Sequence, residues 1–135
     1  IEGTVDENGK LSKKEPEINK EAVISKETSE QMRQVLEGVR KVGGAKDPSG
    51  YQIGGKTGTS QTIVGGKYVD YQTIGSYVGF GGGDEAEYVI MVAVWGENQN
   101  LQGSKDAAPI FTEISNWLLN LSGNGFNATL YFRCL

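Results

Sequence analysis

The fold is decided by residues 51–95, which read YQIGGKTGTSQTIVGGKYVDYQTIGSYVGFGGGDEAEYVIMVAVW. Two glycine clusters divide this stretch into three runs that are rich in β-branched and aromatic residues. These runs predict three strands, over about residues 51–62, 71–80 and 87–95. Because the glycine-rich connections between them are short, we expect hairpins and therefore an antiparallel sheet.

Helices are expected on both sides of this sheet. The third run holds eight consecutive apolar residues at 88–95, a pattern typical of a strand that is covered on both faces. Ahead of the sheet, Ser25 is a suitable N-cap for a helix that ends at Gly43-Gly44. Its apolar residues recur at helical spacing and predict a stripe that faces the core: Met32, Val35, Leu36 and Val39.

A second helix is predicted after the sheet, from about Ser104 or Asp106 to Leu121. Pro109 is compatible with its first turn, where a missing N–H costs little. Three aromatic residues, Trp95, Phe111 and Trp117, are expected in the core rather than in a ligand site. The fold class is therefore α+β, an antiparallel sheet of at least three strands covered by helices.

Composition excludes several classes of function. The 135 residues include 13 basic and 17 acidic residues, and the net charge of −4 argues against nucleic-acid or anionic-membrane binding. With no histidine and a single cysteine, Cys134, the chain has no Ser-His-Asp triad, internal disulfide or His/Cys metal site. We therefore expect no metal and no cofactor. No apolar run is long enough to span a membrane.

The segment whose side chains are best suited to bind a ligand is Lys56-Thr57-Gly58-Thr59, in the first predicted strand. Thr57 and Thr59 are two residues apart, so their hydroxyls should point to the same face. Glycines at 54, 55 and 58 remove side chains, as a strand requires when a ligand backbone approaches closely. A cation, two hydroxyls and backbone N–H groups suit a carboxylate and a carbonyl oxygen. The spacing is not that of a P-loop.

The chain resembles the C-terminal part of a class B penicillin-binding protein transpeptidase domain. Lys-Thr-Gly is a motif of penicillin-binding proteins and class A β-lactamases, and the resemblance extends over about residues 23–121. Further matching segments are VISKET at 23–28, IGGKTGTSQ at 53–61, GSYVGF at 75–80 and AAPIF at 107–111. The expected domain plan is a peripheral hairpin and linker (1–22), the transpeptidase part (23–121) and a tail of open status (122–135).

The resemblance implies a role for each residue of the motif. Lys56 would supply positive potential for catalysis and for substrate binding. The hydroxyls of Thr57 and Thr59, beside Gly58, would hold the carboxylate of a stem peptide ending in D-Ala-D-Ala, or of a β-lactam antibiotic. The backbone N–H of Thr59 would be one of the two oxyanion-hole donors. The resemblance also implies a parent protein on the outer side of a bacterial cytoplasmic membrane.

The sequence lacks the nucleophile motif of this family. No serine here is followed by lysine three residues later, and Ser122-Gly123-Asn124, the one match to Ser-x-Asn, falls after the last helix. We therefore expect this chain to be inactive alone and to need the missing N-terminal part of the domain as a partner. Two alternatives stay open: a non-catalytic peptide- or partner-binding module, and part of a serine β-lactamase-like hydrolase.

Overall fold

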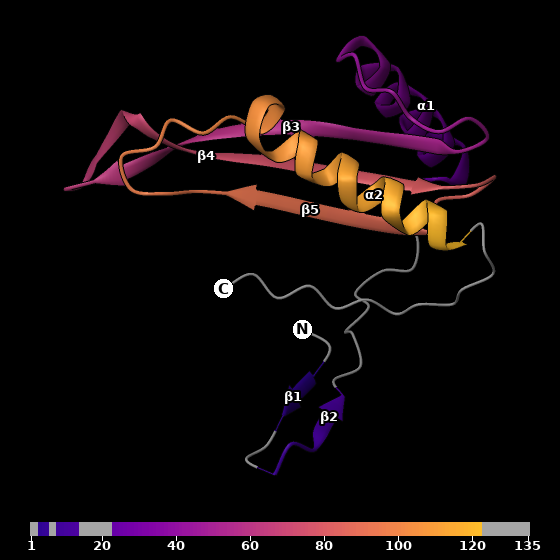
Figure 1. The fold of residues 1–135 in the computed structure, drawn as a ribbon, viewed down its shortest axis with the longest axis horizontal. Helices are drawn as coiled ribbons and strands as arrows, with labels where there is room; N and C mark the ends of the chain where they lie inside the picture. The colour runs from indigo at the N-terminus through magenta and orange to yellow at the C-terminus, as the bar shows by residue number, and fades with distance from the viewer. Residues whose placement is uncertain (1–2, 6–7, 14–22, 123–135) are drawn as a thin grey trace.

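The computed structural model describes residues 3–5, 8–13 and 23–122, and its main feature is a three-stranded antiparallel sheet in the order β3-β4-β5 (Figure 1). In chain order the elements are β1 (Gly3–Val5), β2 (Leu11–Lys13), α1 (Lys26–Val42), β3 (Gln52–Val64), β4 (Lys67–Gly82), β5 (Tyr88–Val94), a π-helical turn η1 (Gly103–Ala107) and α2 (Ala108–Ser122). The α+β fold expected from the sequence is confirmed.

Local sequence signals place the ends of these elements. Ser25 caps α1, since its Oγ accepts a hydrogen bond from the backbone N–H of Thr28 at 3.1 Å. The helix ends at Gly43, as expected. The β3–β4 hairpin turns through Gly65 and Gly66, whose φ angles of 59° and 79° are readily adopted by glycine. Both strands therefore run longer than the sequence predicted.

The N-terminal hairpin is also present. Strands β1 and β2 pair antiparallel in a separate two-stranded sheet, and Gly9 between them has φ of 79°. Residues 14–22, expected to form a linker, and 123–135, expected to form a tail, lie outside the described residues.

The core lies between α2 and one face of the sheet. Phe111 is fully buried and stacks against Tyr77 of β4, with ring centroids 4.7 Å apart and planes tilted by 41°. Ser115, on the same face of α2, is also buried, and its Oγ lies 2.6 Å from the Tyr88 hydroxyl of β5. The remaining buried apolar residues of this cluster are Ile53, Val92, Ala107 and Leu119.

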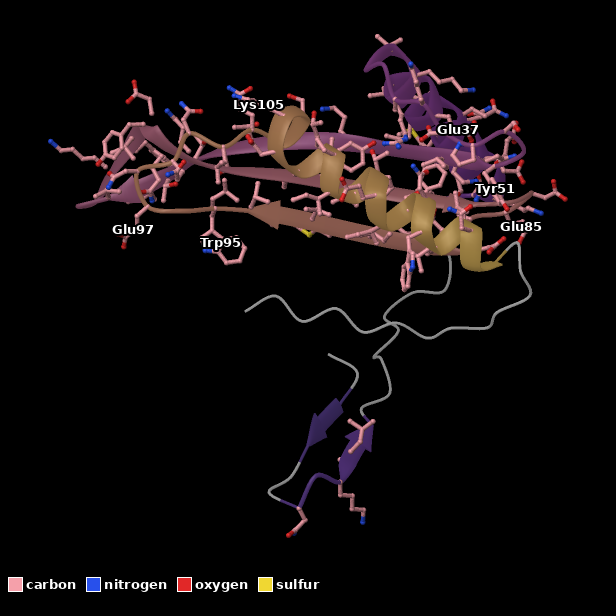
Figure 2. All side chains as sticks on the ribbon, viewed as in Figure 1. Glu37, Tyr51, Glu85, Trp95, Glu97 and Lys105 are labelled. Carbon is pink, nitrogen blue, oxygen red and sulfur yellow. The ribbon has the colours of Figure 1, made fainter. Side chains whose placement is uncertain are left out.

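The opposite face of the sheet is covered at one end only. Near β3 the backbone of α1 lies over Gly54, and Phe80 beside it is buried. Along β5, however, Val89 is 73% exposed, Met91 68% and the nearby Trp95 66%, and Figure 2 shows Trp95 pointing away from the sheet. Within the described residues, the expectation that helices cover both faces along β5 is therefore wrong.

The predicted apolar stripe of α1 does not face the core. Met32, Val35 and Val39 are exposed, whereas Leu36 is half-buried and Arg40 is only 5% exposed. The stripe thus forms a second uncovered apolar surface. Amphipathic spacing identifies an apolar face but does not say which element covers it.

Trp117 of α2 is likewise exposed rather than in the core. The buried line of this helix runs through Phe111, Ser115 and Leu119, at spacings of four residues. Ser115, a polar residue, can occupy the middle of that line because its hydroxyl forms a hydrogen bond with the Tyr88 hydroxyl. Trp117 is therefore directed away from the sheet.

Candidate functional site

The segment Lys56–Thr59 lies in the middle of β3, an outer strand of the sheet. It pairs with β4 through Lys56 opposite Val78 and Thr59 opposite Gly75. Among the described residues no strand pairs with the other edge of β3. An unpaired strand edge can in general accept an extended ligand as a further strand.

The space beside each glycine around the motif is filled by a side chain of β4. A Cβ added to Gly54 would lie 2.5 Å from the ring of Phe80, and one on Gly55 would lie 2.5 Å from the hydroxyl of Tyr77. At Gly58 a Cβ would lie 2.7 Å from Ser76 Oγ. The sequence analysis assigned these glycines to close approach by a ligand, but the rings of Phe80 and Tyr77 already require Gly54 and Gly55 to be small.

Lys56 is exposed, and its Nζ donates to the backbone carbonyl of Thr57 at 2.9 Å and to Thr57 Oγ1 at 3.4 Å. No carboxylate of the described residues forms a salt bridge with it. The Lys56 ammonium group therefore lies beside the Thr57 hydroxyl, and no acidic side chain of the described residues forms a salt bridge with it there.

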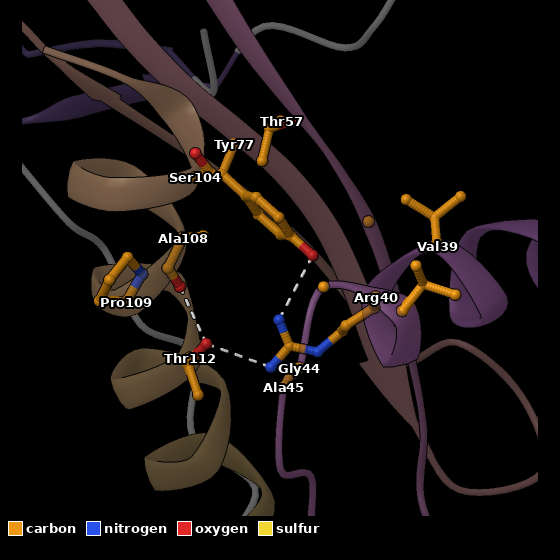
Figure 3. A pocket seen from close by; sticks show the side chains of 13 residues that line it. Val39, Arg40, Gly44, Ala45, Thr57, Tyr77, Ser104, Ala108, Pro109 and Thr112 are labelled. Atoms are coloured by element: carbon orange, nitrogen blue, oxygen red, sulfur yellow. Dashed lines mark hydrogen bonds between the residues drawn. The ribbon is translucent and has the colours of Figure 1, made fainter.

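Thr57 and Thr59 both face the segment that leads into α2. Thr57 lines a cleft together with Ser104 of η1 (Figure 3), and Thr59 Oγ1 accepts a hydrogen bond from the backbone N–H of Gly103 at 3.3 Å. Thr59 is exposed and Thr57 half-buried. Each hydroxyl oxygen therefore accepts from a donor of the chain itself.

The cleft has a volume of about 440 Å³ and lies where α1, β3 and α2 meet. Arg40 forms its floor: its Nη1 donates to the Tyr77 hydroxyl at 3.3 Å and its Nη2 to Thr112 Oγ1 at 3.1 Å (Figure 3). Its Nε and Nη2 also bind both carboxylate oxygens of Asp47, at 2.6–3.0 Å. One guanidinium thereby connects α1, the following loop, the sheet and α2.

The surroundings of Arg40 favour its charged form. Burial, the largest single effect, lowers the pKa of Arg40. The hydrogen bonds to Asp47 and Tyr77, together with the attraction of the same two groups, outweigh burial and raise this pKa above its ordinary value. The guanidinium also lies 5.2 Å from the centroid of the Phe111 ring. The Arg40 side chain therefore holds α1, β4 and α2 together next to the candidate site.

Sequence reasoning missed Arg40 and the turn at Gly103. Nothing in the sequence singles out Arg40, although it lies four residues after Leu36 and therefore on the same face of the helix. The sequence does not show that position 103 must be glycine, because the backbone atoms that exclude a side chain there belong to strands distant in sequence. Both are known only from tertiary structure.

Residues 3–5, 8–13 and 23–122 contain no cluster of three or more acidic, histidine or cysteine side chains that could hold a metal ion. None of the helices in these ranges is long and apolar enough to cross a membrane.

Comparisons with known proteins identify the family. Residues 1–116 match the family model of the penicillin binding protein transpeptidase domain. The chain is 42% identical over 108 residues to stage V sporulation protein D of Bacillus subtilis, covering 78% of this chain and 17% of that protein. It is 34% identical over 134 residues to penicillin-binding protein PbpB of Mycolicibacterium smegmatis, covering 88% of this chain and 20% of that protein.

Solved structures show the same relationship. Penicillin binding protein 3 of Mycobacterium tuberculosis, complexed with ampicillin, matches with a TM-score of 0.63 and 29% identity over 91% of this chain and 30% of that chain. Its complex with aztreonam has the same TM-score at 27% identity, over all of this chain and 33% of that one. This chain belongs to the penicillin-binding protein transpeptidase family. It spans about a fifth of the length of the curated relatives compared above.

Proposed function

We propose that this chain forms the carboxylate-binding edge of a serine-type D,D-transpeptidase, with Lys56–Thr59 as the segment that contacts substrate. The observation that carries this proposal is the direction of two hydroxyl groups. Thr57 Oγ1 accepts from Lys56 Nζ and Thr59 Oγ1 accepts from the N–H of Gly103, so each hydroxyl proton is left to donate to a further acceptor. Two outward donors beside a lysine favour an anion, and a carboxylate fits that pattern.

In the proposed reaction a serine oxygen attacks the carbonyl carbon of the penultimate D-Ala of a stem peptide. The C–N bond breaks, the terminal D-Ala leaves with a proton on its amine, and an acyl-enzyme ester remains. The amine of a neighbouring stem peptide then displaces the serine. During acylation Thr57 and Thr59 hold the terminal carboxylate, which departs with the leaving D-Ala. In both steps the backbone N–H of Thr59 donates to the negatively charged carbonyl oxygen.

β-Lactams are the proposed inhibitors of this site. The related M. tuberculosis protein is solved in complex with ampicillin and with aztreonam, which supports β-lactam binding at the equivalent edge here. Such compounds carry an anionic group near the reactive carbonyl, and the same two hydroxyls would hold it.

The partner we propose is the upstream part of the same domain, which carries the serine and packs on the uncovered apolar surfaces. One surface is the β5 side, with Val89, Met91 and Trp95, and the other is the α1 stripe. The structural relatives support this partner, since all of this chain matches only a third of the related chain. Family resemblance supports placing the complete protein on the outer side of the cytoplasmic membrane.

The test is the rate of acylation by a penicillin, followed by intact-mass spectrometry on the complete domain. Thr59→Val removes the hydroxyl but keeps the β-branched shape, and we expect acylation to slow roughly 10–100-fold, as for a lost hydrogen bond to a charged group. Lys56→Ala should slow it further. Ser60→Ala is the matched control, because this adjacent exposed hydroxyl donates only to the backbone carbonyl of Gln61.

A second outcome would favour a different function. If Thr59→Val and Lys56→Ala both acylate at the wild-type rate, the Lys56–Thr59 strand is not the substrate groove. A non-catalytic binding module that retains the sheet would then describe the chain better.

A further inference from the structure

The π-helical turn η1 is attached to the candidate site by its first residue. Gly103 is buried against β3 and β4, and a Cβ there would overlap the backbone carbonyl oxygens of Ser76 and Gly58. No side chain fits between the turn and the strands. Its N–H is therefore held beside Thr59, whose Oγ1 it reaches at 3.3 Å.

The segment before the turn is fastened to β4. The backbone N–H of Thr73 donates to the carbonyl of Gln99 at 2.9 Å, and Thr73 Oγ1 donates to the carbonyl of Leu101 at 2.6 Å. Gln102 then lies over Gly75, where an added Cβ would be 2.7 Å from the Gln102 carbonyl carbon. These contacts fix the position of η1 relative to β4, the strand that pairs with the Lys56–Thr59 segment.

The turn is closed by Asp106. Its Oδ2 accepts from the backbone N–H of Gln102 at 2.7 Å, and its own N–H donates to the carbonyl of Gln102 at 2.9 Å. The carboxylate and the backbone of one residue thus hold the position immediately before Gly103. Loss of the carboxylate would free the Gln102 N–H and loosen the turn at the point where it meets Thr59. π-Helical turns are frequent at functional sites.

We infer that Gly103 and Asp106 are positioning residues that direct the Thr59 hydroxyl toward the ligand carboxylate. A threonine hydroxyl has one proton to donate and can accept through its lone pairs. Because the N–H of Gly103 occupies an acceptor position of this oxygen, the hydroxyl proton points away from that N–H and is left to donate to a ligand. The inference rests on the proposed function, since it assumes that an anion is bound at that edge.

The experiment is a double-mutant cycle on acylation of the complete domain, with wild type, Asp106→Ala, Thr59→Val and the double variant. The probes are benzylpenicillin and its methyl ester, which lacks the negative charge. We expect Asp106→Ala to slow acylation by benzylpenicillin roughly 3–10-fold, a fraction of a full charge-assisted hydrogen bond. It should leave the ester rate unchanged and cause no further loss once Thr59 is valine.

Asp106→Asn is the matched control, because its amide oxygen can still accept from the N–H of Gln102, and its rate should stay within about twofold of wild type. The inference is overturned if Asp106→Ala slows both probes equally, or if its effect adds in full to that of Thr59→Val, since the aspartate would then act only on the fold. If Thr59→Val itself has no effect, the proposed carboxylate contact fails and this inference fails with it. A Thr59→Val effect combined with an inert Asp106→Ala overturns the inference alone.

Discussion

Replacement of Arg40 by methionine should destabilise the protein by about 3 kcal/mol. Arg40 is 5% exposed, and its side chain is the only cation within salt-bridge distance of Asp47 in the described residues. The substitution keeps an apolar stem of similar length but leaves the Asp47 carboxylate without its cation. Breaking a buried ion pair from one side typically costs about 3–5 kcal/mol, and we expect the lower end because the Asp47 side chain retains 16% exposure to water.

The assay is urea unfolding of the complete domain, with the free energy of unfolding compared at constant m-value. Lys41→Met is the matched control, since this neighbouring cation in the last turn of α1 is exposed, and it should change stability by less than about 0.5 kcal/mol. Arg40→Met combined with Asp47→Asn should recover part of the loss, because the uncompensated charge is gone. If Arg40→Met costs no more than Lys41→Met, the guanidinium does not connect the helices and the sheet as argued.

Three further outcomes are expected. Phe111→Ala should cost about 3–5 kcal/mol because the ring is fully buried, whereas Trp117→Ala, at an exposed position of the same helix, should cost less than about 1.5 kcal/mol in the same urea titration; equal losses would mean that α2 docks through another face. Burial raises the pKa of Tyr88, and the hydrogen bond between Tyr88 and Ser115 lowers this pKa by a smaller amount. The unfolded chain therefore loses this proton first, and the folded state loses stability as the pH rises above about 10. Tyr88→Phe should therefore show a shallower alkaline loss of unfolding free energy than wild type between pH 9 and 11, and parallel curves would refute the assignment. This chain incubated alone with excess benzylpenicillin should show no acyl adduct by intact-mass spectrometry, because no serine here has the Ser-x-x-Lys context; a stoichiometric adduct on any of its serines would contradict the need for an upstream part.

The elements of this fold were predictable because their signals are local. The N-cap at Ser25, the glycines after α1 and the Gly65-Gly66 turn each act within a few residues, and the structure confirms all three. The orientation of each helix was not predictable in the same way. The apolar stripe of α1 and the tryptophan of α2 at position 117 were assigned to the core, but the faces that meet the sheet centre on Arg40 and Ser115.

These errors have a common physical cause. A hydrophobic stripe shows that a helix has an apolar surface, and burial then depends on whichever element lies opposite. Arg40 and Ser115 are buried because Asp47 and Tyr88 satisfy their polar groups, and those partners are 7 and 27 residues away in the sequence. No pattern within either helix records them.

The candidate site shows the same division. Lys56, Thr57 and Thr59 were found from a short motif and its family resemblance. Gly103 was not found, because its hydrogen bond to Thr59 joins segments 44 residues apart in sequence. Arg40 was not found either, because its bond to Tyr77 of the neighbouring strand spans 37 residues. A motif identifies the groups that can contact a ligand, whereas tertiary packing sets the direction in which they donate.

The most direct test of the central claim is a crystal structure of the complete domain acylated by benzylpenicillin. We expect carboxylate oxygens within about 3 Å of the hydroxyls of Thr57 and Thr59, and the acyl carbonyl oxygen about 2.7–3.1 Å from the backbone nitrogen of Thr59. An acyl group bound with its carboxylate away from this strand, and with its carbonyl oxygen on other donors, would contradict the proposed role of Lys56–Thr59.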